Sequence, residues 1–393
     1  MGLVSLVVAG VRPLLPVLAH NLGVSPALIG VMVASFAVVP LVLAIPMGFW
    51  VARTGTGRLA TLGGVGIALG VLSVVVWPTY PGLLVCQLLL GICHLAVAVD
   101  TQTTVSGVDG REDRARALGL YTTFISGGQL VGPLLAGVSA DAFGFRTTIG
   151  MAAFVAVPLL LAARRLLPET NGRRVARDVA ARPSAAHAPT PVGGDQVFSL
   201  FKNPSVVLSM ASGFAVIFTL GVRQAFLPLY VEMLGYSSTA LGGLLSARAL
   251  ASMFSRILMD RLTTIAGGRF RLLVAALLVT GLALGTIPLM STMAGLLLVS
   301  VLVGAAAGLV QPLSMVALAE GTDRDLHGLA VSVRLTGNRL AQLISPLVFG
   351  VVAEARGIGA AFYAAGGVLL LVTAGLLPFG RLYPKGRPVE RGV

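Results

Sequence analysis

The sequence has little charge for its length. Of 393 residues only 11% are charged, whereas 56% are hydrophobic, and the mean hydropathy is +0.93. Soluble domains carry about 25% charged residues, so a water-soluble globule is excluded. Because about twenty apolar residues span a bilayer as one helix, the composition predicts an all-α integral membrane protein.

Cysteine and lysine are also scarce. The two cysteines, Cys86 and Cys93, lie two helical turns apart in one apolar run, too far for a disulfide. The only lysines, Lys202 and Lys385, lie in polar segments, so the sequence has no glycine-rich phosphate loop ending in lysine. We also find no metal-ligand cluster and no nucleophile constellation. The sequence therefore predicts no enzyme activity, no metal and no cofactor, and leaves ion or solute gradients as the energy source.

Apolar runs long enough to cross a bilayer occur twelve times. The runs are 2–20, 26–50, 59–77, 82–106, 117–141, 147–167, 204–232, 238–260, 271–290, 293–318, 329–353 and 358–380. One long break, residues 168–203, separates the sixth run from the seventh. It is rich in Pro, Ala and Arg and lacks helical periodicity, which is typical of a flexible linker. We therefore predict an N-terminal six-helix bundle (1–167), a cytoplasmic linker (168–203), a C-terminal six-helix bundle (204–380) and a cytoplasmic tail (381–393).

Loop charge predicts the orientation. The net charge of +13 is concentrated in the loops after even-numbered runs and in the tail, while the opposite loops hold only Arg146 and Arg356. Cytoplasmic loops of membrane proteins carry the excess of Lys and Arg. We therefore expect a protein of the cytoplasmic membrane with both termini on the cytoplasmic side. This spread explains the basic charge without a nucleic-acid partner.

The second half of the chain repeats the first. The segment Gly132–Gly137 recurs as Ser345–Gly350 at an offset of 213, and Asp141 recurs as Glu354 at the same offset. The two acids follow the fifth and eleventh runs, where we expect them to form outer-surface ion pairs with the neighbouring arginines. Parallel halves with a site between them are a design of transporters, so the repeat predicts a transporter.

The first run is shorter than its repeat. Pro16 matches Pro228 at an offset of 212, but the seventh run extends some 24 residues ahead of Pro228, while only 15 residues precede Pro16. Either the first helix is abbreviated or the true start of the protein lies upstream of Met1, and we favour the second.

The fifth run carries a specific pattern of small residues. The pattern consists of Gly119, Gly128, Gly132, Pro133, Ala136 and Gly137. It resembles the fifth-helix motif of the drug/proton antiporters in the major facilitator superfamily, and the likeness to the superfamily covers essentially the whole chain. The resemblance implies twelve transmembrane helices in two pseudo-symmetric six-helix bundles, and it favours an exporter. A stripe of small residues also lets helix backbones approach closely, which any tight transmembrane contact would use.

Two further segments resemble the superfamily less completely. In the loop after run 2, Gly48, Arg53 and Gly55 match its cytoplasmic motif, but Ala52 stands where an acid is expected. The second copy keeps the acid and the base, in Asp260 and Arg261. The resemblance implies that Arg53, Asp260 and Arg261 act in gating. In the fourth run, Gln87 replaces the arginine that the antiporters associate with proton coupling.

Charged and polar side chains inside the runs are candidate substrate ligands, because ionisable groups in a membrane are costly and usually functional. The candidates are Arg12, Arg223, Arg248, Asn338, Arg339 and Gln342. Arg12 and Arg223 occupy nearly equivalent places in the two halves and could bind a carboxylate or phosphate bidentately. Alternatively, they satisfy carbonyls freed by nearby prolines, or Arg223 pairs with Glu232. In run 11, Arg334, Asn338, Gln342 and Ser345 form a polar stripe that lines the path or binds run 8.

Asp100 and His94 are the candidate proton carriers. Asp100 lies in the cytoplasmic third of run 4, where an alternating-access cycle would change its surroundings, and His94 titrates near neutrality. The structural alternatives are a permanent ion pair of Asp100 with an arginine and a hydrogen-bonding role for His94. The sequence thus predicts proton-coupled efflux of a small organic molecule by a functional monomer in a lipid bilayer. Uptake or exchange of a small anionic metabolite, and a transporter-like sensor, are the alternatives.

Overall fold

The structure is a computed structural model of the full chain, and it describes all residues except 55–56, 109, 167–199, 323 and 382–393. The described part of the chain forms thirteen α-helices and two short 3-10 helices. The helices of the first half are α1 (Gly2–Asn21), α2 (Pro26–Thr54), α3 (Arg58–Val76), α4 (Tyr80–Ser106), α5 (Arg111–Phe143) and α6 (Phe145–Leu166). Those of the second half are α9 (Pro204–Met233), α10 (Ser238–Ile257), α11 (Met259–Ile265), α12 (Arg269–Thr286), η1 (Ile287–Leu289), α13 (Met293–Gly321), α14 (Arg324–Arg356), α15 (Ile358–Leu376) and η2 (Leu377–Arg381).

The helices match the apolar runs, with three informative differences. Run 8 is interrupted, since α10 ends at Ile257 and the short α11 begins at Met259. Helices α5 and α14 each begin several residues before the predicted run, because their first turns carry charged residues that hydropathy excludes. By length and composition, nine helices of the described residues could cross a membrane. Helices α10 and α14 are not among them, because arginines lower their hydropathy.

The repeat is visible in the backbone at the ends of corresponding helices. Gly23 (φ 77°) follows α1 and Gly235 (φ 79°) follows α9, its counterpart in the second half. Gly144 (φ 81°) follows α5, and Gly357 (φ 85°) follows α14. Glycine adopts this left-handed conformation without the strain of a Cβ, and it commonly ends helices. Each of these glycines therefore stops its helix and starts the next one in the same way in both halves.

By backbone contacts the chain divides into two compact units. Unit 1 consists of Met1–His187, Leu220–Ala249 and Gln342–Ala361, and unit 2 of Ala188–Thr219, Leu250–Ala341 and Phe362–Val393. The division passes through α9, α10, α14 and α15, so each unit receives part of these helices. The predicted linker falls almost wholly outside the described residues, and the two-bundle boundaries remain a prediction.

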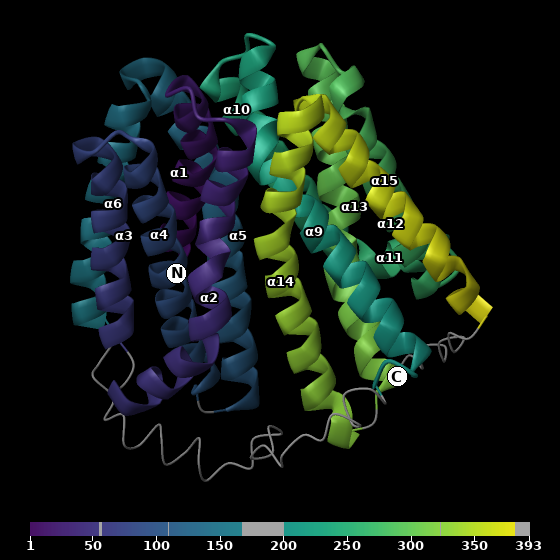
Figure 1. Cartoon of the computed structure of the whole chain (residues 1–393). Coiled ribbons are helices and arrows are strands. Elements are labelled where there is room, and N and C mark those ends of the chain that lie inside the picture. The colour runs from purple at the N-terminus through teal and green to yellow at the C-terminus, as the bar shows by residue number, and fades with distance from the viewer. Residues whose placement is uncertain (55–56, 109, 167–199, 323, 382–393) are drawn as a thin grey trace. The chain divides into compact units, whose positions relative to one another are not determined.

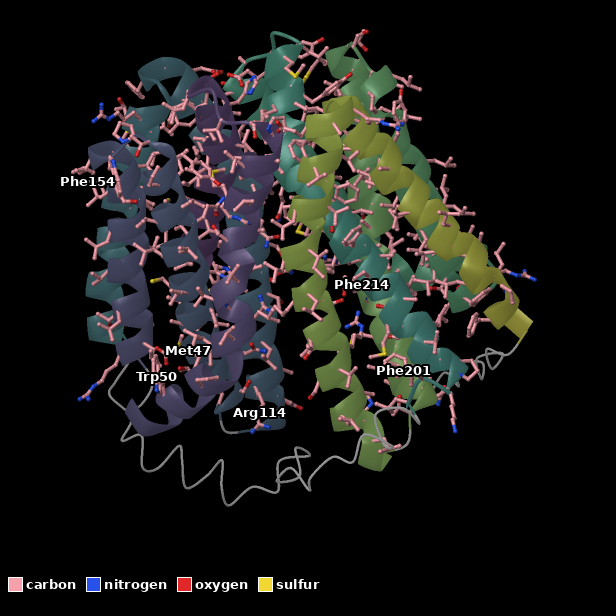
Figure 2. The ribbon with its side chains drawn as sticks, viewed as in Figure 1. Met47, Trp50, Arg114, Phe154, Phe201 and Phe214 are labelled. Carbon is pink, nitrogen blue, oxygen red and sulfur yellow. The ribbon has the colours of Figure 1, made fainter. Side chains whose placement is uncertain are left out.

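Unit 1 is built around α1 and α4. Helix α1 packs against α5 and α6, while α4 packs against α2 and α3. Helix α3 also packs against α6, so α1 to α6 form one bundle (Figure 1). Near the end of α2, Met47 and Trp50 lie close together (Figure 2), with Met47 buried against Leu59 and Leu95 and Trp50 50% exposed.

Unit 2 packs its helices through small and aliphatic residues. A Cβ built on Gly366 of α15 would lie 2.7 Å from the carbonyl oxygen of Gly281 in α12, so these two helices touch through their backbones. Helix α12 also packs against α13. Where two helices cross this closely, glycine is required at the contact.

The outward faces of several helices are strongly apolar. Leu62 of α3 is 66% exposed, Phe154 of α6 77% and Leu371 of α15 74%. Phe154 projects away from the bundle in Figure 2. An apolar surface of this kind is unfavourable in water but suits contact with lipid.

Candidate functional site

Arg12 of α1 is half-buried in unit 1. Its Nη2 donates a hydrogen bond to Oε1 of Gln224 in α9, at 3.2 Å. Its guanidinium carbon lies 3.8 Å from the centroid of the Phe36 ring in α2, a cation–π contact. Neither contact neutralises the charge. Arg12 Nε is buried and has no acceptor among the described residues.

Two further arginines belong to the same region of unit 1. Arg223 precedes Gln224 in α9 and is only 8% exposed. Arg248 of α10 lies in unit 1 as well. Among the described residues, Arg223 forms no hydrogen bond or ion pair. The predicted alternative, an ion pair with Glu232, does not form among the described residues: Oε1 of Glu232 accepts a hydrogen bond from Asn21 at 3.1 Å, and its Oε2 is buried without a partner.

These side chains define the arginine cluster, namely Arg12, Arg223, Gln224 and Arg248 with Phe36. Three of the predicted substrate ligands thus belong to unit 1, and their binding role remains a prediction. Sequence reasoning missed Gln224 and Phe36. The repeat held the signal, since Gln224 is the repeat mate of Arg12 and Arg248 that of Phe36, both at an offset of 212. Like charges held together in a medium of low dielectric constant favour an anion between them.

The polar stripe of α14 faces protein. Ser345 is fully buried and contacts Gly221 of α9, while Asn338 and Gln342 are half-buried. Arg339 is half-buried as well, and it falls in unit 2 with Asn338, whereas Gln342 falls in unit 1. Ser345 of the stripe therefore packs on α9, and Arg334 packs on α13. A substrate role for Asn338, Arg339 and Gln342 remains a prediction.

Asp100 of α4 caps the start of α3. Its fully buried carboxylate accepts hydrogen bonds from the backbone N–H of Gly57, at 2.9 and 3.0 Å, and from that of Ala60, at 2.7 Å. The first N–H groups of a helix lack partners within it and favour a negative charge. The partner of Asp100 is thus a helix terminus. His94, two turns earlier, is half-buried and its ring lies 5.9 Å from that of Phe36.

Few contacts are described for the predicted gating residues. The side chain of Arg53 lies outside the described residues, as does Gly55. Asp260 and Arg261 are both exposed on α11, and within the described part of the chain neither forms an ion pair. Their role in gating remains a prediction. The described ion pair near this end of the protein joins Arg269 to Glu320.

The glycine pattern of α5 forms its contact with α1. A Cβ on Gly128 would lie 2.5 Å from the carbonyl oxygen of Gly2 and 2.7 Å from the nitrogen of Leu6. A Cβ on Gly132 would come even closer to the carbonyl oxygen of Leu6, and a Cβ on Gly10 would lie 2.9 Å from the carbonyl oxygen of Gly132. The predicted close approach of helix backbones is confirmed for these two positions. Gly119, by contrast, is exposed with nothing within 4 Å of the Cβ position.

The end of the same motif packs on α10. Gly137 contacts the backbone of Ser238, and Gly242 contacts the carbonyl oxygen of Pro133. The related segment of the second half forms a similar crossing between α14 and α2. There a Cβ on Gly350 would lie 3.2 Å from the Cα of Gly30. Both crossings belong to unit 1. The two related glycine segments thus each join one half of the chain to the other.

A carboxylate accompanies each crossing. Asp141 of α5 accepts hydrogen bonds from the backbone N–H of Ser238, at 2.8 Å, and of Thr239, at 2.7 Å, at the start of α10. Its repeat mate Glu354 accepts one from the backbone N–H of Ala27, at 3.0 Å, at the start of α2. We call the two crossings with these carboxylates the paired crossings.

The expected ion pairs of these two acids are wrong. Arg146 donates from Nε to the backbone oxygen of Val75 at 2.9 Å instead of binding Asp141. A helix N-terminus is a better partner for each acid than an arginine side chain. Its N–H groups converge on the carboxylate, and no long flexible side chain has to be ordered.

Comparisons with known proteins agree with this architecture. The family model described as Major Facilitator Superfamily matches residues 1–322 and 268–392. Multidrug resistance protein MdtG of Klebsiella pneumoniae (strain 342) is 26% identical over 272 residues, 68% of this chain and 61% of MdtG. Multidrug resistance protein 1 of Bacillus subtilis (strain 168) is 26% identical over 162 residues, 41% of this chain and 42% of that protein. The matches thus span about three fifths and two fifths of these relatives.

A solved structure of similar fold is the bacterial homolog of the human lysosomal transporter Spinster, in an inward-facing and occupied conformation. Its TM-score is 0.74 at 15% identity, covering 99% of this chain and 96% of that chain. At this identity the likeness concerns the fold alone.

Proposed function

The chain belongs to the major facilitator superfamily, a family of multi-pass membrane transporters rather than enzymes, and we propose that it exports a small organic molecule by alternating access. The observation that carries the proposal is the paired crossings. Each crossing joins the two halves of the chain by backbone contacts and by a carboxylate that caps a helix, and such contacts can form and break. Export is supported by the resemblance of the α5 motif to the antiporters and by the likeness to two multidrug resistance proteins. The protein would act as a monomer in the cell membrane, with both termini cytoplasmic.

Proton coupling is part of the proposal, with Asp100 as the carrier. In the structure its carboxylate accepts from Gly57 and Ala60 with both oxygens. Protonation would turn one oxygen into a donor facing N–H groups and would weaken this cap. Proton binding at Asp100 would thereby release the start of α3, and the release would link the proton to a conformational change.

The Asp100→Asn variant tests this coupling in reconstituted vesicles. We expect efflux of ethidium, used as the probe, to fall about tenfold under a pH gradient, because asparagine cannot cycle a proton. Exchange of ethidium at equal pH on both sides should stay near the wild-type rate. Asp113→Asn, an exposed acid at the start of α5, serves as the control. If both rates and the melting temperature fall together, Asp100 is structural only and the coupling proposal fails.

A second candidate is transport of an organic anion, and the arginine cluster favours it. The cluster holds three guanidiniums of which Arg12 and Arg223 have no carboxylate partner among the described residues. A substrate carboxylate or phosphate would offset this charge and would accept from unused donors such as Arg12 Nε. Ionic hydrogen bonds contribute about 1.5–3 kcal/mol each, which is enough to select anions.

Replacing Arg223 with glutamine separates the two candidates. If the substrate is anionic, transport of carboxyfluorescein should weaken by roughly tenfold, since one charged hydrogen bond of about 1.5 kcal/mol is lost. Ethidium transport should then be absent in both proteins. Arg356→Gln, an exposed arginine at the end of α14, is the control and should change neither. Ethidium transport that survives in the wild type and in Arg223→Gln contradicts the anion candidate.

A further inference from the structure

Arg334 is a buried charge that lies apart from the arginine cluster, in unit 2. It sits in α14 and only 4% of it is exposed. Gly213 of α9 lets the helix backbone lie directly against the guanidinium, because a Cβ there would be 3.2 Å from Nη2 and 3.3 Å from Nε. The side chain is thus enclosed by α9, α13 and its own helix.

The partners of Arg334 are all neutral and come from α13. Nη2 donates to Oε1 of Gln311 at 2.8 Å and to Oγ of Ser314 at 2.6 Å, with the Gln311 backbone oxygen at 3.5 Å. Nη1 donates to the sulfur of Met315 at 3.0 Å. Within the described residues, no carboxylate pairs with Arg334. A buried guanidinium without a counter-charge is strongly unfavourable.

Three buried donors in this part of unit 2 lack an acceptor among the described residues, and one of them belongs to the guanidinium itself. They are Nε of Arg334, Nε2 of Gln311 and the hydroxyl of Ser209. The amide of Gln311 already holds Arg334, so its nitrogen is adjacent to the guanidinium. Ser209 is fully buried and lies one helical turn before Gly213, on the face of α9 that meets Arg334. Buried polar groups nearly always find a partner.

We propose that Arg334, Gln311 and Ser209 form a binding site for a small anion. The donors are N–H and O–H groups around one positive charge, and they suit a halide ion or a carboxylate. Two sources offer this chemistry, namely chloride from the medium and the acidic group of a transported solute. The site does not depend on the proposed export function, because a bound chloride would stabilise unit 2 whatever the protein transports.

Melting of the purified full chain in detergent tests the site. At constant ionic strength, sodium gluconate is replaced stepwise by sodium chloride or by sodium acetate. We expect the melting temperature of the wild type to rise with one of these anions, because a ligand that binds the folded state stabilises it. Arg334→Gln should lose this dependence. Arg271→Gln, an exposed arginine of α12 in the same unit, should keep it.

Two milder variants keep the test decisive if Arg334→Gln does not fold. Both Ser209→Ala and Gln311→Leu retain the charge of Arg334. The first removes one hydroxyl donor, and the second removes the amide nitrogen together with the Oε1 that accepts from Arg334. We expect at least a tenfold weaker apparent affinity for the anion in each. A response to chloride alone assigns the site to a halide, and a response to acetate assigns it to carboxylates. Equal salt dependence in the wild type and in Ser209→Ala and Gln311→Leu overturns the proposal, since the donors would then need no anion.

Discussion

Replacing Gly128 and Gly132 together by alanine is expected to abolish transport and to lower the melting temperature by many degrees. Each new Cβ would meet the backbone of α1, and at Gly128 it would lie 2.5 Å from the Gly2 oxygen and 2.7 Å from the Leu6 nitrogen. A backbone cannot give way as a flexible side chain does, so α1 and α5 must separate. Overpacking of this kind costs about 1–3 kcal/mol per site. The measurement is thermal unfolding of the purified variants, together with their transport rate.

The chain provides a matched control one residue away. Gly127 lies in the same helix turn as Gly128, but nothing lies within 4 Å of its Cβ position. Alanine there should be neutral or slightly stabilising, since a helical glycine loses more backbone entropy than alanine. Gly119→Ala should behave likewise. Equal melting temperatures for Gly127→Ala and Gly128→Ala would mean that the helices do not touch where the structure places the contact.

The double variant Asp141→Asn with Glu354→Gln is expected to shift the protein strongly toward a state in which the paired crossings are open. Each carboxylate binds the N-terminus of a helix from the other half, Asp141 at α10 and Glu354 at α2. A charge at a helix N-terminus contributes about 1 kcal/mol. Losing both would cost about 2 kcal/mol, and the equilibrium would shift by roughly 30-fold.

Maleimide labelling of a cysteine placed at Ser246 measures this shift. Ser246 is 8% exposed and its hydroxyl donates to the backbone oxygen of Leu130, so it lies within the contact of α10 with α5. The native Cys86 and Cys93 are both buried. Labelling should accelerate in the double variant and stay unchanged in Glu112→Gln, an exposed acid in the first turn of α5. An unchanged rate in the double variant would show that the carboxylates do not hold the crossings closed.

The positions of the helices could be predicted because apolar runs and turn residues are local signals. The repeat is a further signal of this kind, since related glycines with positive φ follow related helices at Gly23 and Gly235 and at Gly144 and Gly357. The helix ends were less predictable. Charged first turns, such as that of α5, have no hydropathy signal although they continue the helix.

Partners across helices could be predicted only in part. The arginines Arg12, Arg223 and Arg248 were recognisable, because a charge within an apolar run is visible in the sequence. Their neutral neighbour Gln224 was missed, because an isolated polar residue stands out little and only its place as the repeat mate of Arg12 marked it. The partners of Asp100 and Asp141 were missed for a different reason. Each binds backbone N–H groups at the start of a distant helix, and backbone groups leave no trace in the residue types.

The hydrogen bond between Arg12 and Gln224 bears on how a duplicated chain departs from its origin. The two residues are repeat mates at an offset of 212 and they touch each other. In a symmetric homodimer the same residue faces its own copy at such a place, so an arginine there would meet an arginine. Fusing the two copies into one gene removes that constraint, and one copy can keep the donor while the other becomes the acceptor. The contact between Arg12 and Gln224 is therefore one that two identical subunits could not make at this place.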